Sequence, residues 1–345
     1  MALTEGEKKQ LWSSIQGAIA VRQKRRRKRL AQRYSVAGAT CLLLAGTLWW
    51  LVRDHVEENR EYAILDRMAK DVQHTPASGS NQVQLNLGDG KVLELDDEST
   101  ITYQAESLEV SQQGAIQRRH QLAPRQVEQY HTLHVPYGKR AEVILPDGST
   151  VWLNAGSALT FPAMFDSTER DVYLIGEGYF EVAHRSDQPF TLHTKNLNIN
   201  VLGTSFNVSA YENDDYAVAQ LVEGRISLQS VAPDGFREVQ MKPGDKATLN
   251  RSANRLTVDE NAGEPDILWR KKQLLLTRKS LPEILKKMER VYNAEIEIVG
   301  QTSEKLTFSG SLDVSKPATE VLSYLYHPGK FTITQQERRI TIRRK

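Results

Sequence analysis

Three spacings of hydrophobic residues follow one another along this chain of 345 residues, and each predicts a different structure. Residues 34–52 are free of charge, and as a helix they would span about 28 Å, close to the thickness of a bilayer core. Between residues 82 and 258, hydrophobic and polar residues alternate in short segments separated by Gly, Pro, Asn and Asp, which is typical of β-strands. After Pro265, helical spacing appears beside further short strands.

The alternating region predicts an all-β domain over residues 82–262, built as a sandwich, barrel or stack. Val83, Leu85 and Leu87 precede the turn Gly88–Asp89–Gly90, which indicates a hairpin that returns through Val92. A second hairpin is predicted around Pro146–Asp147–Gly148, because residues 141–145 and 151–153 alternate on either side of it.

The remaining residues, 266–345, predict a small α+β domain with two helices packed on one sheet. Ser280 followed by Pro282 predicts a helix that runs to Tyr292, and a second helix is expected over residues 319–326 with Ser315 as its cap. The expected strands are residues 272–277, 294–299, 306–312, 331–334 and 339–342.

The charges that flank residues 34–52 give the apolar stretch a direction. Residues 22–33 contain eight Lys or Arg, whereas Asp54, Glu57, Glu58 and Glu61 follow the stretch. Basic flanks stay in the cytoplasm, so we expect a single-pass protein of the inner membrane, with residues 1–33 in the cytoplasm and the bulk in the periplasm. Residues 53–81 would form a juxtamembrane helix and linker. A cleaved signal peptide and a buried core helix are the alternatives to a span.

The cytoplasmic tail has the pattern of an amphipathic helix. Leu11, Ile15 and Ile19 recur at a spacing of four with Trp12 beside them, and Thr4 with Glu7 forms a capping-box pattern. A helix this short is marginal alone in water, so its apolar stripe needs a cover. That cover is either a partner protein or the surface of the membrane lipid. The basic run serves as a topology signal, and direct nucleic-acid binding is not expected.

Composition and motifs argue against an enzyme. The single cysteine, Cys41, excludes an intramolecular disulfide and makes a Cys/His zinc site improbable, and no cofactor is expected. No nucleophile elbow, phosphate loop or zinc-protease motif is present in the sequence. His131 and His134 lie in a predicted strand, where they would not share a face. Glu177 and Glu181 suggest a glycosidase pair, but we interpret them as exposed strand carboxylates.

Several segments together resemble the FecR family of transmembrane sigma-factor regulators. In order they are GKRAEVILPDGSTVWLNAGSALTFP, RDVYLIGEGYFEVAH, PFTLHT, VLGTSFNVSAY, LVEGRISL and MKPGDKA, all between Gly138 and Ala247. Residues 273–343 resemble the C-terminal domain that often follows, a fold similar to the short N-terminal domain of secretins and TonB-dependent transducers. The motif positions, expected to be structural, are Pro146, Asp147, Gly148, Trp152, Asn154, Gly176, Phe180, Phe190, Gly203, Thr204, Phe206 and Asn207.

The resemblance implies an anti-sigma factor. Its tail would bind an extracytoplasmic-function sigma factor through Leu11, Trp12, Ile15 and Ile19, and its periplasmic part would contact the signalling domain of a TonB-dependent outer-membrane receptor. Two alternatives from other classes remain: a membrane-tethered periplasmic carbohydrate-binding or hydrolytic β-domain, and a scaffolding protein of the envelope. The first predicts that replacing residues 1–33 with an unrelated basic leader leaves function intact, and the second predicts an envelope-stability defect with no change in transcription.

Overall fold

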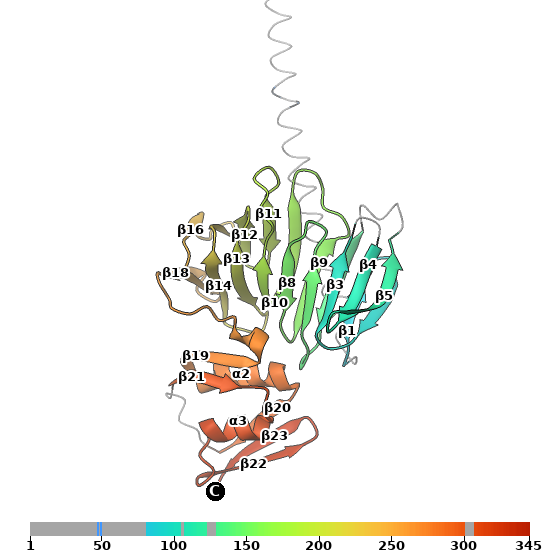
Figure 1. The fold of residues 1–345 in the computed structure, drawn as a ribbon. Helices are drawn as coiled ribbons and strands as arrows, with labels where there is room; N and C mark the ends of the chain where they lie inside the picture. The colour runs from blue at the N-terminus through green and yellow to red at the C-terminus, as the bar shows by residue number, and fades with distance from the viewer. Residues whose placement is uncertain (1–46, 48, 50–80, 105–106, 123–128, 301–306) are drawn as a thin grey trace, which may run out of the picture. The chain divides into compact units, whose positions relative to one another are not determined.

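The computed structural model describes residues 47, 49, 81–104, 107–122, 129–300 and 307–345. The chain divides into two compact units, residues 1–64 and 65–345, and every described residue except Thr47 and Trp49 belongs to the second. Thr47 and Trp49 are helical and exposed. The second unit contains a large β-domain, residues 81–262, and a C-terminal module, residues 266–345 (Figure 1).

The β-domain consists of two sheets that share one long strand. In the first sheet the strands are ordered β2 (Val92–Leu95), β1 (Val83–Asn86), β6 (Tyr130–Val135), β9 (Ser157–Pro162), β10 (Arg170–Glu181), β11 (Phe190–His193), β12 (Leu197–Val201), β15 (Ile226–Ser230) and β16 (Val239–Met241). Neighbouring strands are antiparallel except β10 and β11.

The second sheet also runs along the length of the domain, and it shares β10 with the first. Its order is β5 (Ala115–Gln121), β4 (Ser107–Gln112), β3 (Ser99–Tyr103), β7 (Ala141–Ile144), β8 (Thr150–Leu153), β10, β13 (Ser205–Ala210), β14 (Tyr216–Glu223), β17 (Lys246–Asn250) and β18 (Arg255–Asp259). Figure 1 shows the strands as a row from β5 at one end to β16 and β18 at the other.

Strand β10 passes from the first sheet to the second at Gly176. Its residues Tyr173–Ile175 pair with β9, whereas residues from Gly176 onward pair with β13. Gly176 has φ +96°, and a Cβ there would lie 2.6 Å from the Cα of Ser157. Only glycine fits this crossing, which is the bend that lets one strand serve both sheets.

One continuous hydrophobic core lies between the two sheets. Alternate residues on facing strands contribute to it, for example Leu133 and Leu159 from the first sheet and Val143 and Phe206 from the second, all fully buried. This alternation follows from the two-residue repeat of a strand. The prediction of an all-β domain is confirmed, and so are both predicted hairpins, since β1 pairs with β2 and β7 with β8.

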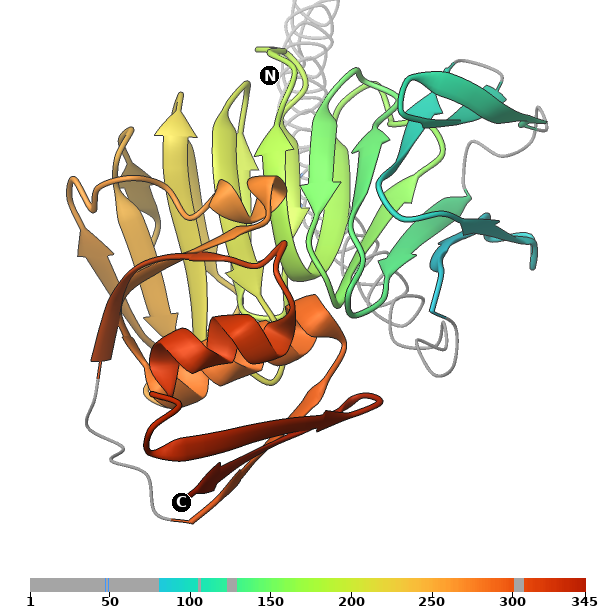
Figure 2. The same cartoon turned by 60° about the horizontal axis from the view of Figure 1, so that its bottom comes forward.

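The C-terminal module places its helices between two small sheets. β19 (Gln273–Ser280) pairs with β21 (Thr307–Asp313), and β20 (Glu295–Val299) pairs with β23 (Arg339–Arg344), which also pairs with β22 (Phe331–Gln336). Helices α2 (Leu281–Tyr292) and α3 (Ala318–Leu325) lie between these sheets in Figures 1 and 2. The expectation of one sheet was therefore wrong: the module has a two-stranded and a three-stranded sheet, and hydrophobic residues of both sheets pack with those of the two helices in one core.

The sequence predicted the N-cap of α2 correctly but not that of α3. Ser280 caps α2 and Glu283 completes a capping box, as the pattern predicted. The Ser315 cap of α3 was wrong: Pro317 occupies the N-cap position, and the hydroxyl of Ser315 donates to Asp313 Oδ1 at 2.5 Å instead. The side chain of Ser315 is thus engaged by a carboxylate two residues earlier, and the helix begins without a side-chain cap.

Within the described residues no helix is both long and apolar enough to cross a membrane. The predicted span, residues 34–52, lies outside them apart from Thr47 and Trp49.

Candidate functional site

The outer face of the second sheet carries a cluster of motif residues where β8, β10 and β13 run side by side. The register places Tyr179 on β10 directly between Trp152 on β8 and Asn207 on β13. Alternation points these side chains away from the core, into which Phe180 and Phe206 point, with stacked rings 5.1 Å apart. The C-terminal module covers this face (Figure 2). We call the contact region the domain junction.

Glu177 is the buried acid of the domain junction. It is 4% exposed, and its carboxylate accepts hydrogen bonds from Asn154 Nδ2 at 2.8 Å and Asn207 Nδ2 at 3.2 Å. The interpretation of Glu177 as an exposed strand carboxylate was wrong, because the module covers this part of β10. Glu181, four residues along on the same side, does remain open to solvent. The structure gives the two carboxylates different environments.

Trp269 joins the module to Asn207. It lies in the 3-10 helix η2 (Leu268–Lys271), which connects the β-domain to β19, and it is 5% exposed. Its indole N–H donates to Asn207 Oδ1 at 3.2 Å, and its carbonyl accepts from Arg140 Nη1 at 2.6 Å. Asn207 therefore uses one side-chain atom for Glu177 and the other for Trp269, so this motif residue links the two parts of the unit.

Arg270 binds to two aromatic rings of the β-domain. Its guanidinium carbon lies 4.6 Å from the ring centre of Trp152 and 4.2 Å from that of Tyr179. Glu181 is 3.8 Å away and supplies the opposite charge. An arginine over aromatic faces is attracted by their quadrupoles, typically by about 0.5–2 kcal/mol. Trp152, a motif residue expected to be structural, thus contacts the module rather than the core.

Helix α2 adds two cations that are paired with acids outside the helix. Lys287 Nζ lies 2.8 Å from Asp266 Oδ2, and Arg290 Nη2 lies 2.5 Å from Asp214 Oδ1. Arg290 also covers the ring of Tyr211 at 3.7 Å. Asp214 belongs to the β-domain, so the Arg290 pair holds α2 against that domain, whereas Asp266 lies at the start of the module and the Lys287 pair fixes this connecting segment to α2.

The electrostatics of the junction depend on burial and on these pairs. Burial raises the pKa of Glu177 above its usual range, although Lys287 and the two amide donors act in the opposite direction. Burial alone would lower the pKa of Lys287, but Asp266 and Glu177 outweigh it, and the pKa lies above its usual range. A cavity of about 20 Å³ lies between these groups, lined by Glu177, Lys287 and Trp269. It has room for about one water molecule.

The other motif residues stabilise the β-domain. Asp147 accepts a hydrogen bond from the backbone N–H of Ser149 at 2.9 Å, and its other oxygen lies 2.6 Å from Arg170 Nη1. Arg170 is fully buried, and its Nε donates to the carbonyl of Gln188 at 2.9 Å. Gly148 has φ +88°, as the turn requires. The turn therefore also anchors a buried ion pair.

Two further motif positions lie where backbone segments approach closely. A Cβ on Gly203 would lie 2.6 Å from the Cα of His184, so a side chain does not fit at this position. Thr204 Oγ1 donates to the carbonyl of Arg225 at 3.0 Å. Pro146 is half-buried, and Phe190 is in the core.

Residues Leu11, Trp12, Ile15 and Ile19, predicted to bind a sigma factor, lie outside the described residues. The described part of the chain contains no group of three or more His, Cys, Asp or Glu that could hold a metal ion. The junction residues Tyr211, Trp269, Lys287 and Arg290 were not predicted. A tryptophan ahead of the first predicted strand of the C-terminal domain was the one signal that could have drawn attention to Trp269.

Comparisons with known proteins agree with this architecture. The family described as FecR protein matches residues 131–227, and the family described as FecR, C-terminal, matches residues 273–342. No match was found among curated proteins.

Two solved structures of a candidate anti-sigma factor from Parabacteroides distasonis are similar to the chain. The first is 25% identical over 63% of this chain and 99% of that chain, with a TM-score of 0.56. The second is 26% identical over 62% of this chain and 99% of that chain, with a TM-score of 0.55.

The fold of this chain is thus similar to that of the two solved structures over 63% and 62% of its length. The chain belongs to the FecR family, with its FecR domain in the β-domain and its FecR C-terminal domain in the module.

Proposed function

We propose that the chain is an anti-sigma factor of the inner membrane that binds an extracytoplasmic-function sigma factor with its tail. The observation that carries the proposal is the order of the FecR and FecR C-terminal domains in one chain, together with the likeness to a candidate anti-sigma factor. A regulator of this kind is not an enzyme. Its output is the availability of the sigma factor.

The charge pattern supports a transmembrane arrangement for this regulator. The eight basic residues in 22–33 precede the uncharged stretch 34–52, and an acidic segment follows. This order favours a cytoplasmic tail and a periplasmic β-domain and module. The apolar stripe of Leu11, Trp12, Ile15 and Ile19 would then be available to the sigma factor.

The signal would come from the signalling domain of a TonB-dependent outer-membrane transducer. We propose that this partner binds the C-terminal module and that the domain junction passes the effect to the β-domain. A partner shifts an equilibrium only by its different affinities for two states. The junction supplies contacts that can differ between states, because Trp269, Arg270 and Arg290 bind residues of the β-domain through polar and aromatic groups.

The test is a pull-down from native cells with the protein tagged at its C-terminal end. Wild type is compared with Trp12→Ala and with Trp50→Ala, which makes the same chemical change outside the tail. We expect a sigma factor to co-purify with wild type and Trp50→Ala and to be lost with Trp12→Ala.

A second variant replaces residues 1–33 with an unrelated basic leader. The proposal expects loss of sigma-dependent transcriptional control. Retention of function with the foreign leader, or recovery of envelope proteins alone in all three pull-downs, would refute the anti-sigma role. The result would favour a tethered carbohydrate-binding or scaffolding protein.

A further inference from the structure

The free edges of the sheets differ in how they are protected against pairing with another strand. Natural proteins protect edge strands by shortness, charge or bulges. In the described part of the chain, the edges β2 and β16 are only four and three residues long. Strand β5 contains Arg118 and Arg119, and β18 begins with Arg255 and ends with Asp259. These four edges of the β-domain are protected.

Three of the four edges in the C-terminal module are protected in the same ways. Strands β19 and β21 pair with a register shift between Leu276 and Lys279. Strand β20 presents Glu295 and Glu297. The exception is β22, whose six residues, FTITQQ, contain no charge, no proline and no glycine. Its register with β23 is continuous, and among the described strands β22 pairs with β23 alone.

The composition of β22 suits pairing with a further strand. Phe331 and Ile333 are half-buried against the helices, whereas Thr332 and Thr334 are exposed on the other face. Threonine and aromatic residues favour the extended conformation. An extended segment of a partner could therefore form backbone hydrogen bonds along β22 without displacing anything that the structure describes.

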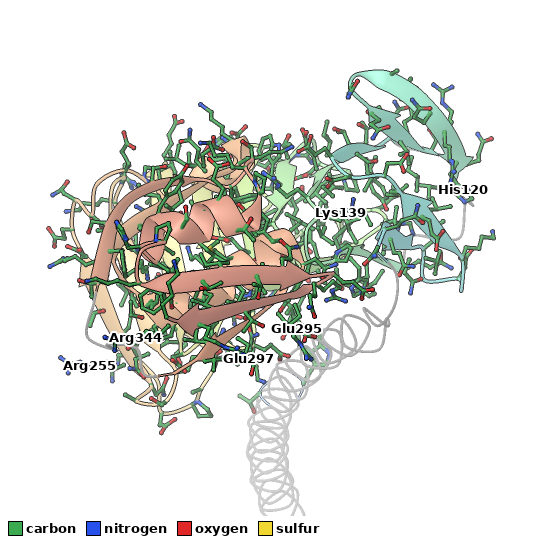
Figure 3. The ribbon with its side chains drawn as sticks, turned by 90° about the horizontal axis from the view of Figure 1, so that it is seen from below. His120, Lys139, Arg255, Glu295, Glu297 and Arg344 are labelled. Atoms are coloured by element: carbon green, nitrogen blue, oxygen red, sulfur yellow. The ribbon has the colours of Figure 1, made fainter. Side chains whose placement is uncertain are left out.

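The surroundings of β22 are cationic. Residues 330–345 contain six Lys or Arg and one acid, Glu337. Arg343 pairs in register with Thr332, and Arg344 with Phe331, so both cations lie on β23, directly behind the edge strand and one strand away from its free side. The acids of β20 lie away from Arg344: Figure 3 shows Glu295 and Glu297 toward one end of this sheet and Arg344 toward the other.

We infer that β22 is the docking edge for an extended acidic segment of a partner protein, which adds a strand to the sheet and places its carboxylates across β22 from Arg343, Arg344 and Lys345. The inference rests on the proposed function, since it names the chemistry of the partner that delivers the signal to the module. Complementary charge selects such a partner and increases its association rate. A second copy of this chain fits poorly, because self-pairing at β22 would bring the two cationic segments 330–345 together.

The test uses the full-length chain in detergent micelles and two fluorescent ten-residue peptides. Both peptides alternate Val or Thr with a charged residue, which is Glu in one and Lys in the other. Fluorescence anisotropy should show the acidic peptide binding at least about tenfold more tightly than the lysine peptide, with affinity falling as salt rises. Equal binding of the two peptides would overturn the inference.

Variants locate the binding to the edge. Thr334→Glu places a negative charge on β22, and Thr257→Glu makes the same change on β18, at another exposed edge position. We expect Thr334→Glu and Arg343→Glu each to weaken the acidic peptide by about tenfold, and Thr257→Glu to leave it unchanged. An unchanged affinity in Thr334→Glu would contradict edge pairing.

Two further measurements separate the alternatives. Sedimentation that shows a dimer of the wild type, lost in Thr334→Glu, would assign the edge to a second copy and refute the inference. Recovery of the sigma factor with Thr334→Glu tests the proposed function separately, because the tail is intact in that variant. Failure of the peptide test thus leaves the anti-sigma role standing, and absence of the sigma factor leaves the docking edge standing.

Discussion

Two histidines of β6 make the stability of the β-domain sensitive to acid. His131 is fully buried and His134 is 8% exposed. The Nδ1 of His131 lies 2.5 Å from the hydroxyl of Tyr103, whereas Nε2 of both histidines has no hydrogen-bond partner. Protonation would therefore place a charge in the interior with an N–H that nothing accepts.

The pKa values give the size of this effect. Burial lowers the pKa of His131 from 6.5 to about 4, with Asp89 acting against the shift and His120 adding to it. Burial lowers the pKa of His134 from 6.5 to about 4 as well. The unfolded chain binds protons more readily than the folded one, so the stabilisation is complete above pH 6.5 and is lost as pH falls toward 4. Between pH 7.5 and 5.0 each histidine should cost about 2 kcal/mol, or about 4 kcal/mol together.

Urea unfolding followed by tryptophan fluorescence measures this loss at the two pH values. The double variant His131→Gln/His134→Gln is less stable at pH 7.5 but cannot titrate, so its pH dependence should be smaller than that of wild type by about 4 kcal/mol. His184→Gln, at an exposed position of the β-domain, is the matched control and should keep the wild-type dependence. If wild type and the double variant lose the same free energy of unfolding between pH 7.5 and 5.0, the argument from burial is refuted.

Two substitutions test the ion pair and the domain junction. Arg170→Ala leaves Asp147 buried beside an empty space and should lower the free energy of unfolding by about 3–5 kcal/mol, whereas Lys195→Ala removes an exposed pair and should cost less than about 1 kcal/mol. A loss of similar size in both would contradict the assigned burial. Trp269→Ala removes a buried indole and its hydrogen bond to Asn207, and should cost about 3–5 kcal/mol and increase hydrogen exchange in η2. Tyr324→Ala, which removes a ring that is 56% exposed, is the control and should leave hydrogen exchange in η2 unchanged. Unchanged hydrogen exchange in Trp269→Ala would show that the junction does not hold the module.

Much of the fold could be predicted because its signals are local. The two hairpins, the start of α2 at Ser280 and most strands of the module were found from turn residues, caps and periodicity within a few positions. Local prediction failed at Ser315, whose side chain is bound to the neighbouring Asp313 while Pro317 occupies the N-cap position. Local rules weaken where two local partners are available.

The candidate site could be predicted only in part. Motif residues such as Trp152 and Asn207 were identified by resemblance, but their contacts with the module were not. Trp269 and Asn207 are separated by 62 positions, and no periodicity within either segment refers to the other. The partner of an outward-facing strand residue depends on what covers the sheet.

By itself the sequence determined the order of the elements, the two-residue alternation that builds a shared core and the glycine and aspartate turns between strands, because these depend on backbone geometry over a few residues. It also determined the family. Only the tertiary structure decided that Glu177 is buried while Glu181 is exposed, that Asp147 pairs with Arg170, and that β22 is the unprotected edge. Burial, charge pairing and edge exposure depend on which distant segments pack together. The alternation of side chains along a strand is the same whether its outer face is covered or open to solvent, so the sequence of the strand does not reveal the difference.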